Sequence, residues 1–129
     1  MKQTRPSNLE MQALSVLWEH GPLPARAVLE KMPDKKPRAY TTILSVLQVM
    51  ERKGLVTHKT DGNRHVYAPK AKQHTVIGSM LKSMVKNIFG GSASTAMQHL
   101  LETTPVSQDE LAEMRRLLAD YEKANPQPK

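Results

Sequence analysis

The sequence predicts a mainly α-helical protein that contains one small β-hairpin. Three segments of the first half place apolar residues every three or four positions, which is the period of an amphipathic helix. After Gly54 the period changes to two around an Asp-Gly pair, which is typical of a hairpin turn. From residue 74 onward the helical period returns. We therefore predict two domains, residues 1–70 with three helices and the hairpin, and residues 71–129 with helices alone.

The first two helices have recognisable ends. The first begins after Ser7, because Ser7 and Glu10 form the S-x-x-E capping box of SNLE, and it stops at Gly21. The stretch GPLP that follows is predicted to be a turn. Pro24 suits the first position of a second helix, ARAVLEKM, which ends before Pro33.

The third helix lies within RAYTTILSVLQVMERKGL, residues 38–55, and ends at a lysine and a glycine. Its core stripe consists of Ile43, Val46, Leu47 and Met50. Its opposite side carries Arg38, Thr41, Ser45, Gln48 and Arg52, flanked by Thr42 and Val49. The only carboxylate, Glu51, lies toward the core boundary, whereas a face meant only for water usually mixes both charges. Short uncharged side chains between arginines suit a helix that enters the major groove of DNA, where carboxylates repel phosphates.

The hairpin is predicted over LVTHKTDGNRHVYAP. A two-residue Asp61-Gly62 loop pairs Lys59 with Arg64, so that two cations lie together near the tip. Three helices followed by a basic β-ribbon is the element order of a winged helix-turn-helix, whose third helix enters the major groove while the wing follows the phosphate backbone. We therefore predict that the first domain binds DNA. The predicted contacts are Arg38, Tyr40, Thr41, Thr42, Ser45, Gln48, Arg52, Lys59 and Arg64.

The second half holds three predicted helices after the linker APKAKQ. They are HTVIGSMLKSMVKNIF, STAMQHLLE and a last helix that opens with the capping box SQDE. Three helices in about 50 residues bury too little area to offset chain entropy, so we predict that residues 71–129 form a helical dimerisation domain. A dimer holds two third helices at a fixed separation, which matches a two-fold symmetric DNA site. The predicted dimer contacts are Ile77, Leu81, Met84, Ile88, Leu111, Met114, Leu118 and Tyr121.

Charge is unevenly placed along the 129 residues, whose formal net charge is +7. Residues 1–70 hold twelve Lys and Arg against six Asp and Glu, whereas residues 71–129 hold seven against six. This asymmetry predicts an anionic partner for the first half, of which nucleic acid and a membrane surface are the common kinds. No apolar run approaches the ~20 residues of a membrane span, and MKQTRPSNLE lacks the apolar core of a signal peptide. We therefore expect a cytoplasmic protein without membrane insertion.

The sequence predicts no enzyme, no cofactor and no metal site. It contains no cysteine, no glycine-rich phosphate loop and no HExxH motif. His58 and His65 face each other across the predicted hairpin, but two imidazoles do not complete a metal site. We therefore assign both to packing or to the wing surface.

Three stretches of the chain are specific in combination: LEMQALSVLWEHGPLPARAVLEKM, AYTTILSVLQVMERKGLV and DGNRHVYAP. They resemble the opening, the recognition helix and the wing of the penicillinase repressor family, the winged-helix regulators of β-lactamase and methicillin-resistance genes. The resemblance implies a homodimeric repressor on a palindromic operator, released when a membrane-bound β-lactam sensor with a metalloprotease domain triggers cleavage in the dimerisation part. It also implies DNA contacts at Thr41, Thr42, Ser45, Gln48 and Arg64.

The chain departs from the family pattern at three points. Val49 stands where many members have an arginine, so either a phosphate contact is missing or a thymine methyl meets an apolar group. The family's Asn-Phe scissile pair aligns with His99 and Leu100, so cleavage at that bond is not implied here. The cysteine cluster of the copper-responsive branch is absent, which excludes a copper sensor on chemical grounds.

We therefore predict a sequence-specific DNA-binding transcriptional repressor that acts as a homodimer. The alternative is a winged-helix module that docks an acidic protein without reading bases. The neutral face of the third helix argues against this alternative, because lysines bind an acidic protein surface more strongly than threonines do. RNA binding is disfavoured because the A-form major groove does not admit a helix.

Overall fold

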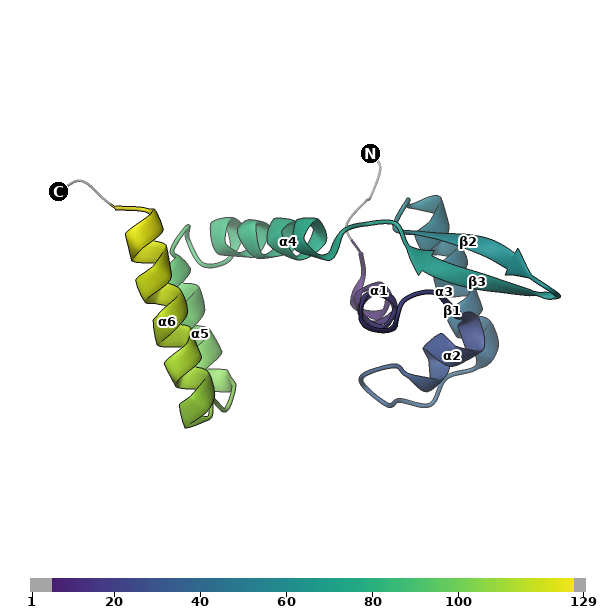
Figure 1. Cartoon of the computed structure of the whole chain (residues 1–129), viewed down its shortest axis with the longest axis horizontal. Coiled ribbons are helices and arrows are strands. Elements are labelled where there is room, and N and C mark those ends of the chain that lie inside the picture. The colour runs from purple at the N-terminus through teal and green to yellow at the C-terminus, as the bar shows by residue number, and fades with distance from the viewer. Residues whose placement is uncertain (1–5, 127–129) are drawn as a thin grey trace. The chain divides into compact units, whose positions relative to one another are not determined.

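The computed structural model describes residues 6–126. It divides into two compact units, Met1–Lys82 and Ser83–Lys129, with the boundary inside helix α4 (Gln73–Asn87). Figure 1 shows the elements of both units, and the first unit is a winged helix, as predicted, with β2 and β3 projecting from three helices as a hairpin. The prediction of a mainly helical chain with a small hairpin is confirmed.

Helices α1 (Asn8–His20) and α3 (Tyr40–Arg52) begin and end where the sequence predicts. The Ser7 side chain accepts a hydrogen bond from the Glu10 backbone N–H at 3.2 Å, and the Glu10 carboxylate accepts one from the Ser7 backbone N–H at 3.0 Å. These two bonds are the predicted capping box. After α3 the chain turns at Gly54 with φ 82°, a left-handed conformation that glycine enters without a side-chain clash.

The sequence predicts only a turn in the segment before α2 (Ala25–Glu30), but the structure also has a short strand there. Leu23–Pro24 forms strand β1, which pairs antiparallel with β3. Pro24 is therefore the N-cap of α2 rather than its first residue. A proline cannot donate to a sheet ladder and signals a turn in sequence, but the strand order β1-β3-β2 puts Pro24 in an edge strand, where proline is tolerated.

The wing consists of β2 (Val56–Asp61) and β3 (Arg64–Pro69), and its predicted register is wrong. The observed pairs are Val56–Pro69, Thr57–Ala68, His58–Tyr67, Lys59–Val66, Thr60–His65 and Asp61–Arg64. The two-residue loop is therefore Gly62-Asn63, and Gly62 has φ 65°. A positive φ at the first loop residue alone fits a type II′ turn, whereas a type I′ loop at Asp-Gly requires a positive φ at the aspartate as well.

The hydrophobic core of the first unit lies where its helices meet the sheet. Its buried side chains are Ala13, Leu14, Val16, Leu17, Ala25, Val28, Met32, Ile43, Leu47, Met50, Leu55, Val56 and Tyr67. Two polar contacts at the margin of this core join parts of the chain that are distant in sequence. Lys53 Nζ lies 2.8 Å from a Glu10 carboxylate oxygen, and the indole N–H of Trp18 donates to the carbonyl oxygen of Ala71 at 3.0 Å.

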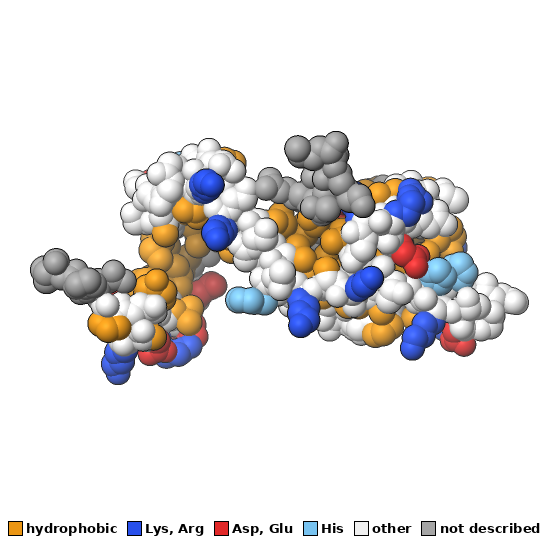
Figure 2. Space-filling model, turned by 90° about the horizontal axis from the view of Figure 1, so that it is seen from above, with side chains coloured by type: hydrophobic (Ala, Val, Ile, Leu, Met, Phe, Trp, Pro, Cys, Tyr) orange, Lys and Arg blue, Asp and Glu red, His pale blue; other side chains and the backbone are white. Residues whose placement is uncertain are grey.

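The second unit contains α5 (Ala93–Thr103), α6 (Gln108–Ala124) and the end of α4. Ser92 and Ser107 cap α5 and α6 by accepting hydrogen bonds from backbone N–H groups three residues further on, each at 3.1 Å. None of the residues described in α4, α5 and α6 is buried, and Figure 2 shows hydrophobic side chains on the surface of this unit, at its left. Between residues 6 and 126 no helix has both the length and the apolar character needed to span a bilayer.

Candidate nucleic-acid interface

The polar side of α3 is open to solvent. Ile43, Leu47 and Met50 are fully buried, so they fix which side of the helix faces outward. The exposed side chains of the opposite side are Thr41, Thr42, Ser45, Gln48 and Arg52. Val46 and Val49, at the margins, are half-buried. This face presents small hydrogen-bonding groups without a carboxylate, which are the groups that can approach base edges in a major groove.

Glu51, the one carboxylate of α3, is held by the wing. His58 Nδ1 lies 2.8 Å from both of its carboxylate oxygens, and Glu51 lines a shallow hollow beside Gln48 and Arg52. The ring of His58 also stacks on that of His65, with centroids 4.3 Å apart and planes at 21°. Stacked imidazoles point their ring nitrogens along nearly parallel planes, so they do not converge on a metal ion. Among residues 6–126 no group of three or more His, Cys, Asp or Glu side chains could hold one.

Arg38, a predicted phosphate contact, is engaged within the subunit. Its two terminal nitrogens donate to the two carboxylate oxygens of Asp34, at 2.9 and 2.5 Å. The Arg38 hydrogen bond and the backbone N–H of Lys36 hold the pKa of Asp34 well below its usual range. Both side chains are largely covered, with 15% and 21% of their areas exposed. The guanidinium therefore organises the loop between α2 and α3, and the Asp34 carboxylate compensates its positive charge.

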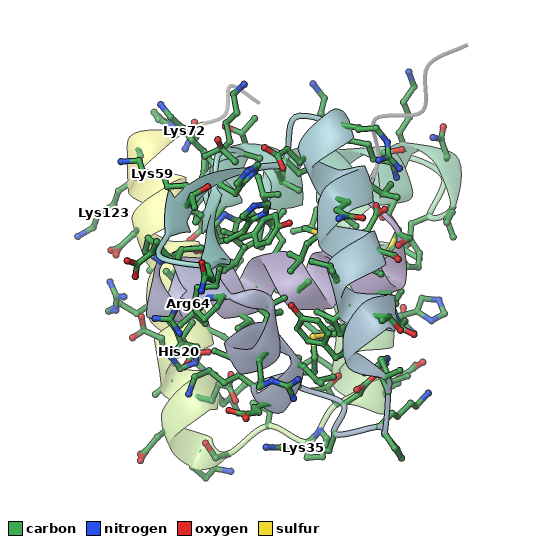
Figure 3. All side chains as sticks on the ribbon, turned by 90° about the vertical axis from the view of Figure 1, so that its right-hand side faces the viewer. His20, Lys35, Lys59, Arg64, Lys72 and Lys123 are labelled. Atoms are coloured by element: carbon green, nitrogen blue, oxygen red, sulfur yellow. The ribbon has the colours of Figure 1, made fainter. Side chains whose placement is uncertain are left out.

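The two predicted wing cations do not lie opposite each other. Lys59 is paired with Val66 and Arg64 with Asp61, and Figure 3 shows the two cations at different places along the wing. The Arg64 guanidinium lies 3.8 Å from the Asp61 carboxylate in an exposed pair. Exposed pairs of this kind contribute about 0–1 kcal/mol, so Arg64 exchanges partners easily.

An open hollow of about 510 Å³ is lined by residues of α2, α3 and the wing. Its lining includes Arg26, Tyr40, Leu44, Gln48, Arg64 and His65. The guanidinium carbon of Arg26 lies 4.8 Å from the ring centroid of Tyr40, which is a cation–π contact between α2 and the first residue of α3. The sequence prediction included Tyr40 but missed Arg26, because the contact joins residues on different helices and follows no sequence spacing.

The chain is similar to known transcriptional regulators. The family model described as penicillinase repressor matches residues 6–120. The transcriptional regulator BlaI of Mycobacterium tuberculosis is 34% identical over 123 residues, which cover 94% of this chain and 88% of that protein. The penicillinase repressor of Bacillus licheniformis is 22% identical over 115 residues, or 89% and 90% of the two chains. Among solved structures, the PcaV transcriptional regulator from Streptomyces coelicolor has a similar fold, with a TM-score of 0.51, 20% identity and coverage of 93% of this chain and 77% of that chain.

Proposed function

This chain belongs to the penicillinase repressor family of DNA-binding transcriptional repressors, and we propose that it acts as a homodimer on a two-fold symmetric operator in double-stranded DNA. Members of this family are regulators and not enzymes. The observation that carries the proposal is the exposed face of α3, on which Thr41, Ser45 and Gln48 present uncharged side chains to solvent. Such a face suits base edges better than it suits water or an acidic protein.

In this proposal the contacts divide by chemistry. Thr41, Thr42, Ser45 and Gln48 read bases, because their hydroxyl and amide groups are short and uncharged. Arg52, Lys59 and Arg64 contact phosphates from the end of α3 and from the wing. Arg38 and Tyr40 remain candidates for phosphate contact, although the charge of Arg38 is already compensated by Asp34.

Dimerisation is proposed to use the apolar side chains of the second half. Leu81, Met84, Ile88, Leu118 and Tyr121 are exposed over 44–69% of their areas, which is unusual for large hydrophobic residues that cluster along helices. Ile77, Leu111 and Met114, the other predicted contacts, are half-buried. A second copy would cover these side chains and would place two α3 helices to match a symmetric operator.

Release from DNA is proposed to act through the second half, either by cleavage triggered by a membrane-bound sensor protease or by another signal. The His99–Leu100 bond, which aligns with the family's scissile pair, lies within α5. The Thr103 hydroxyl donates to the His99 carbonyl oxygen at 2.8 Å, so a protease reaches this bond only after that turn of the helix opens. A helix without buried residues opens at low cost, which supports α5 as the segment that responds.

The base-reading proposal is tested by replacing Gln48 in the full-length protein. Selection of duplexes from a random pool should give a consensus for the wild type, and Gln48→Ala should relax the preference at one base pair by about 1–3 kcal/mol. Lys59→Ala is the matched control, since it should weaken binding to all sequences alike. An unchanged consensus for Gln48→Ala would contradict the assignment, and a wild type without salt-dependent binding to duplex DNA would favour the protein-interaction alternative.

A further inference from the structure

We propose that Arg26 of α2 is a further phosphate contact and that the ring of Tyr40 is the platform that positions it. The inference rests on the proposed function of the winged helix in binding duplex DNA. It goes beyond that function because it gives a role to Arg26, and to its contact with Tyr40, in addition to the base-reading residues of α3. In this role Arg26 contacts the DNA backbone, whereas Tyr40 acts through Arg26.

The charge of Arg26 is uncompensated, in contrast to that of Arg38. Among the described residues Arg26 takes part in no ion pair, while Arg38 donates twice to Asp34. A neutral aromatic face attracts a guanidinium through its quadrupole without neutralising it. Of the two arginines near the start of α3, Arg26 is therefore the one whose positive charge is not already compensated by a carboxylate.

The surroundings of Arg26 favour a phosphodiester. Arg26 from α2 and Arg64 from β3 line the same open hollow, between the polar face of α3 and the wing. Gln48, the proposed base-reading residue, also lines it, and its described lining contains no carboxylate. A duplex whose major groove receives α3 carries a phosphate backbone on each side of that groove, so cations on the walls of this hollow match its charge.

Stacking also explains why an exposed arginine would be effective here. A free arginine side chain loses rotamer freedom when it binds, whereas a guanidinium already seated 4.8 Å from the Tyr40 ring centroid loses less. Tyr40 is the first residue of α3 and is 38% exposed, so its ring ties the position of Arg26 to the helix that enters the groove. The ring face, and not the phenolic hydroxyl, is the group that this role requires.

The test measures binding of the full-length protein to a random-sequence duplex of thirty base pairs, by fluorescence anisotropy over a series of KCl concentrations. Each phosphate contact contributes about 0.9 to the slope of log K against log salt concentration. Arg26→Ala should therefore lower affinity about tenfold and reduce that slope by about 0.9, because one charge-assisted contact is lost. Arg26→Lys should keep the slope with a smaller loss of affinity, since it keeps the charge but loses the planar stack.

Matched variants separate positioning from charge and from folding. Tyr40→Leu should lower affinity without changing the slope, and Tyr40→Phe should lower it less because it keeps the ring face and loses only the hydroxyl. Lys31→Ala, at the other end of α2, removes one charge and should leave the slope unchanged. A wild-type slope for Arg26→Ala, or a loss on Tyr40→Phe equal to that on Tyr40→Leu, would overturn the inference. If the wild type shows no salt-dependent binding at all, the proposed function fails instead.

Discussion

The first unit of the chain closes a hydrophobic core around itself, whereas the helices of the second half leave their apolar side chains on the surface. All buried hydrophobic side chains that the structure describes lie between Ala13 and Tyr67. In the second half Ile88 is 69% exposed and Leu118 is 51% exposed. The first unit therefore contains within itself the burial that stabilises its helices, whereas we propose that a second copy supplies this burial for the helices of the second half.

The difference arises from how the apolar residues are arranged. In α1 the apolar residues cover more than one side, so that Ala13, Leu14, Val16 and Leu17 are all buried against neighbouring elements. In α6 they form a narrow stripe between charged residues, among them Arg116, which pairs with Glu113 and Asp120. A narrow stripe is the pattern of a helix that packs on one partner along a single seam.

The largest expected effect comes from deleting the same side chain in each unit. Leu47→Ala removes a fully buried side chain from the first unit and should lower its free energy of unfolding by about 2–5 kcal/mol. Leu118→Ala should leave that transition unchanged and should instead weaken the proposed dimer. The measurement is urea unfolding followed by the fluorescence of Trp18, the only tryptophan, with sedimentation to follow the dimer. Equal effects of both variants on the tryptophan transition would abolish the contrast.

Much of the first unit could be predicted from the sequence because its signals are local. Ser7 with Glu10 marks the start of α1, and Gly54 marks the end of α3. The polar face of α3 also followed from helical spacing alone, and Thr41, Ser45, Gln48 and Arg52 are exposed, whereas Arg38 is largely covered. These features depend on residues three to four positions apart, so no knowledge of the tertiary structure is needed.

The errors concern contacts that tertiary structure decides. Strand β1 exists because β3 offers its backbone to Leu23–Pro24, which no local pattern shows. The hairpin loop is Gly62-Asn63 and not the predicted Asp61-Gly62. Both dipeptides are common in two-residue hairpin loops, so the packing of the strands decides between them. The roles of the arginines are of the same kind, because Arg26 finds its aromatic partner on another helix.

Glycine replacements sharpen the comparison at a smaller scale. Gly54→Ala forces a side chain into φ 82° at the exit of α3 and should destabilise the first unit by about 1–2 kcal/mol. Gly78 lies within α4, where an added Cβ meets no atom within 4 Å, so Gly78→Ala should stabilise that helix by about 0.5–1 kcal/mol. Thermal unfolding followed by circular dichroism measures both. A Gly78→Ala protein that dimerises more weakly would show that the partner packs against this position.

The smallest expected effect is the pH dependence of unfolding that one ion pair in each unit contributes. Arg38 holds the pKa of Asp34 below its usual range, and Arg116 does the same for the pKa of Glu113. A carboxylate whose pKa is lowered by folding stabilises the folded state above its unfolded pKa, near 4, and this contribution is lost as the pH falls toward the folded value.

Asp34→Asn should therefore unfold more easily than the wild type at pH 6, as followed by Trp18 fluorescence in urea, and the difference should shrink as the pH falls from about 4 toward the lowered pKa of Asp34 in the folded state. Glu113→Gln should leave the same transition unchanged at every pH, because Glu113 and its partner Arg116 both lie on α6, an exposed helix of the second unit. A pH-independent difference for Asp34→Asn would mean that the amide disturbs the loop itself. A response to Glu113→Gln would mean that the two units unfold together, and the self-contained core of the first unit would then no longer explain its stability.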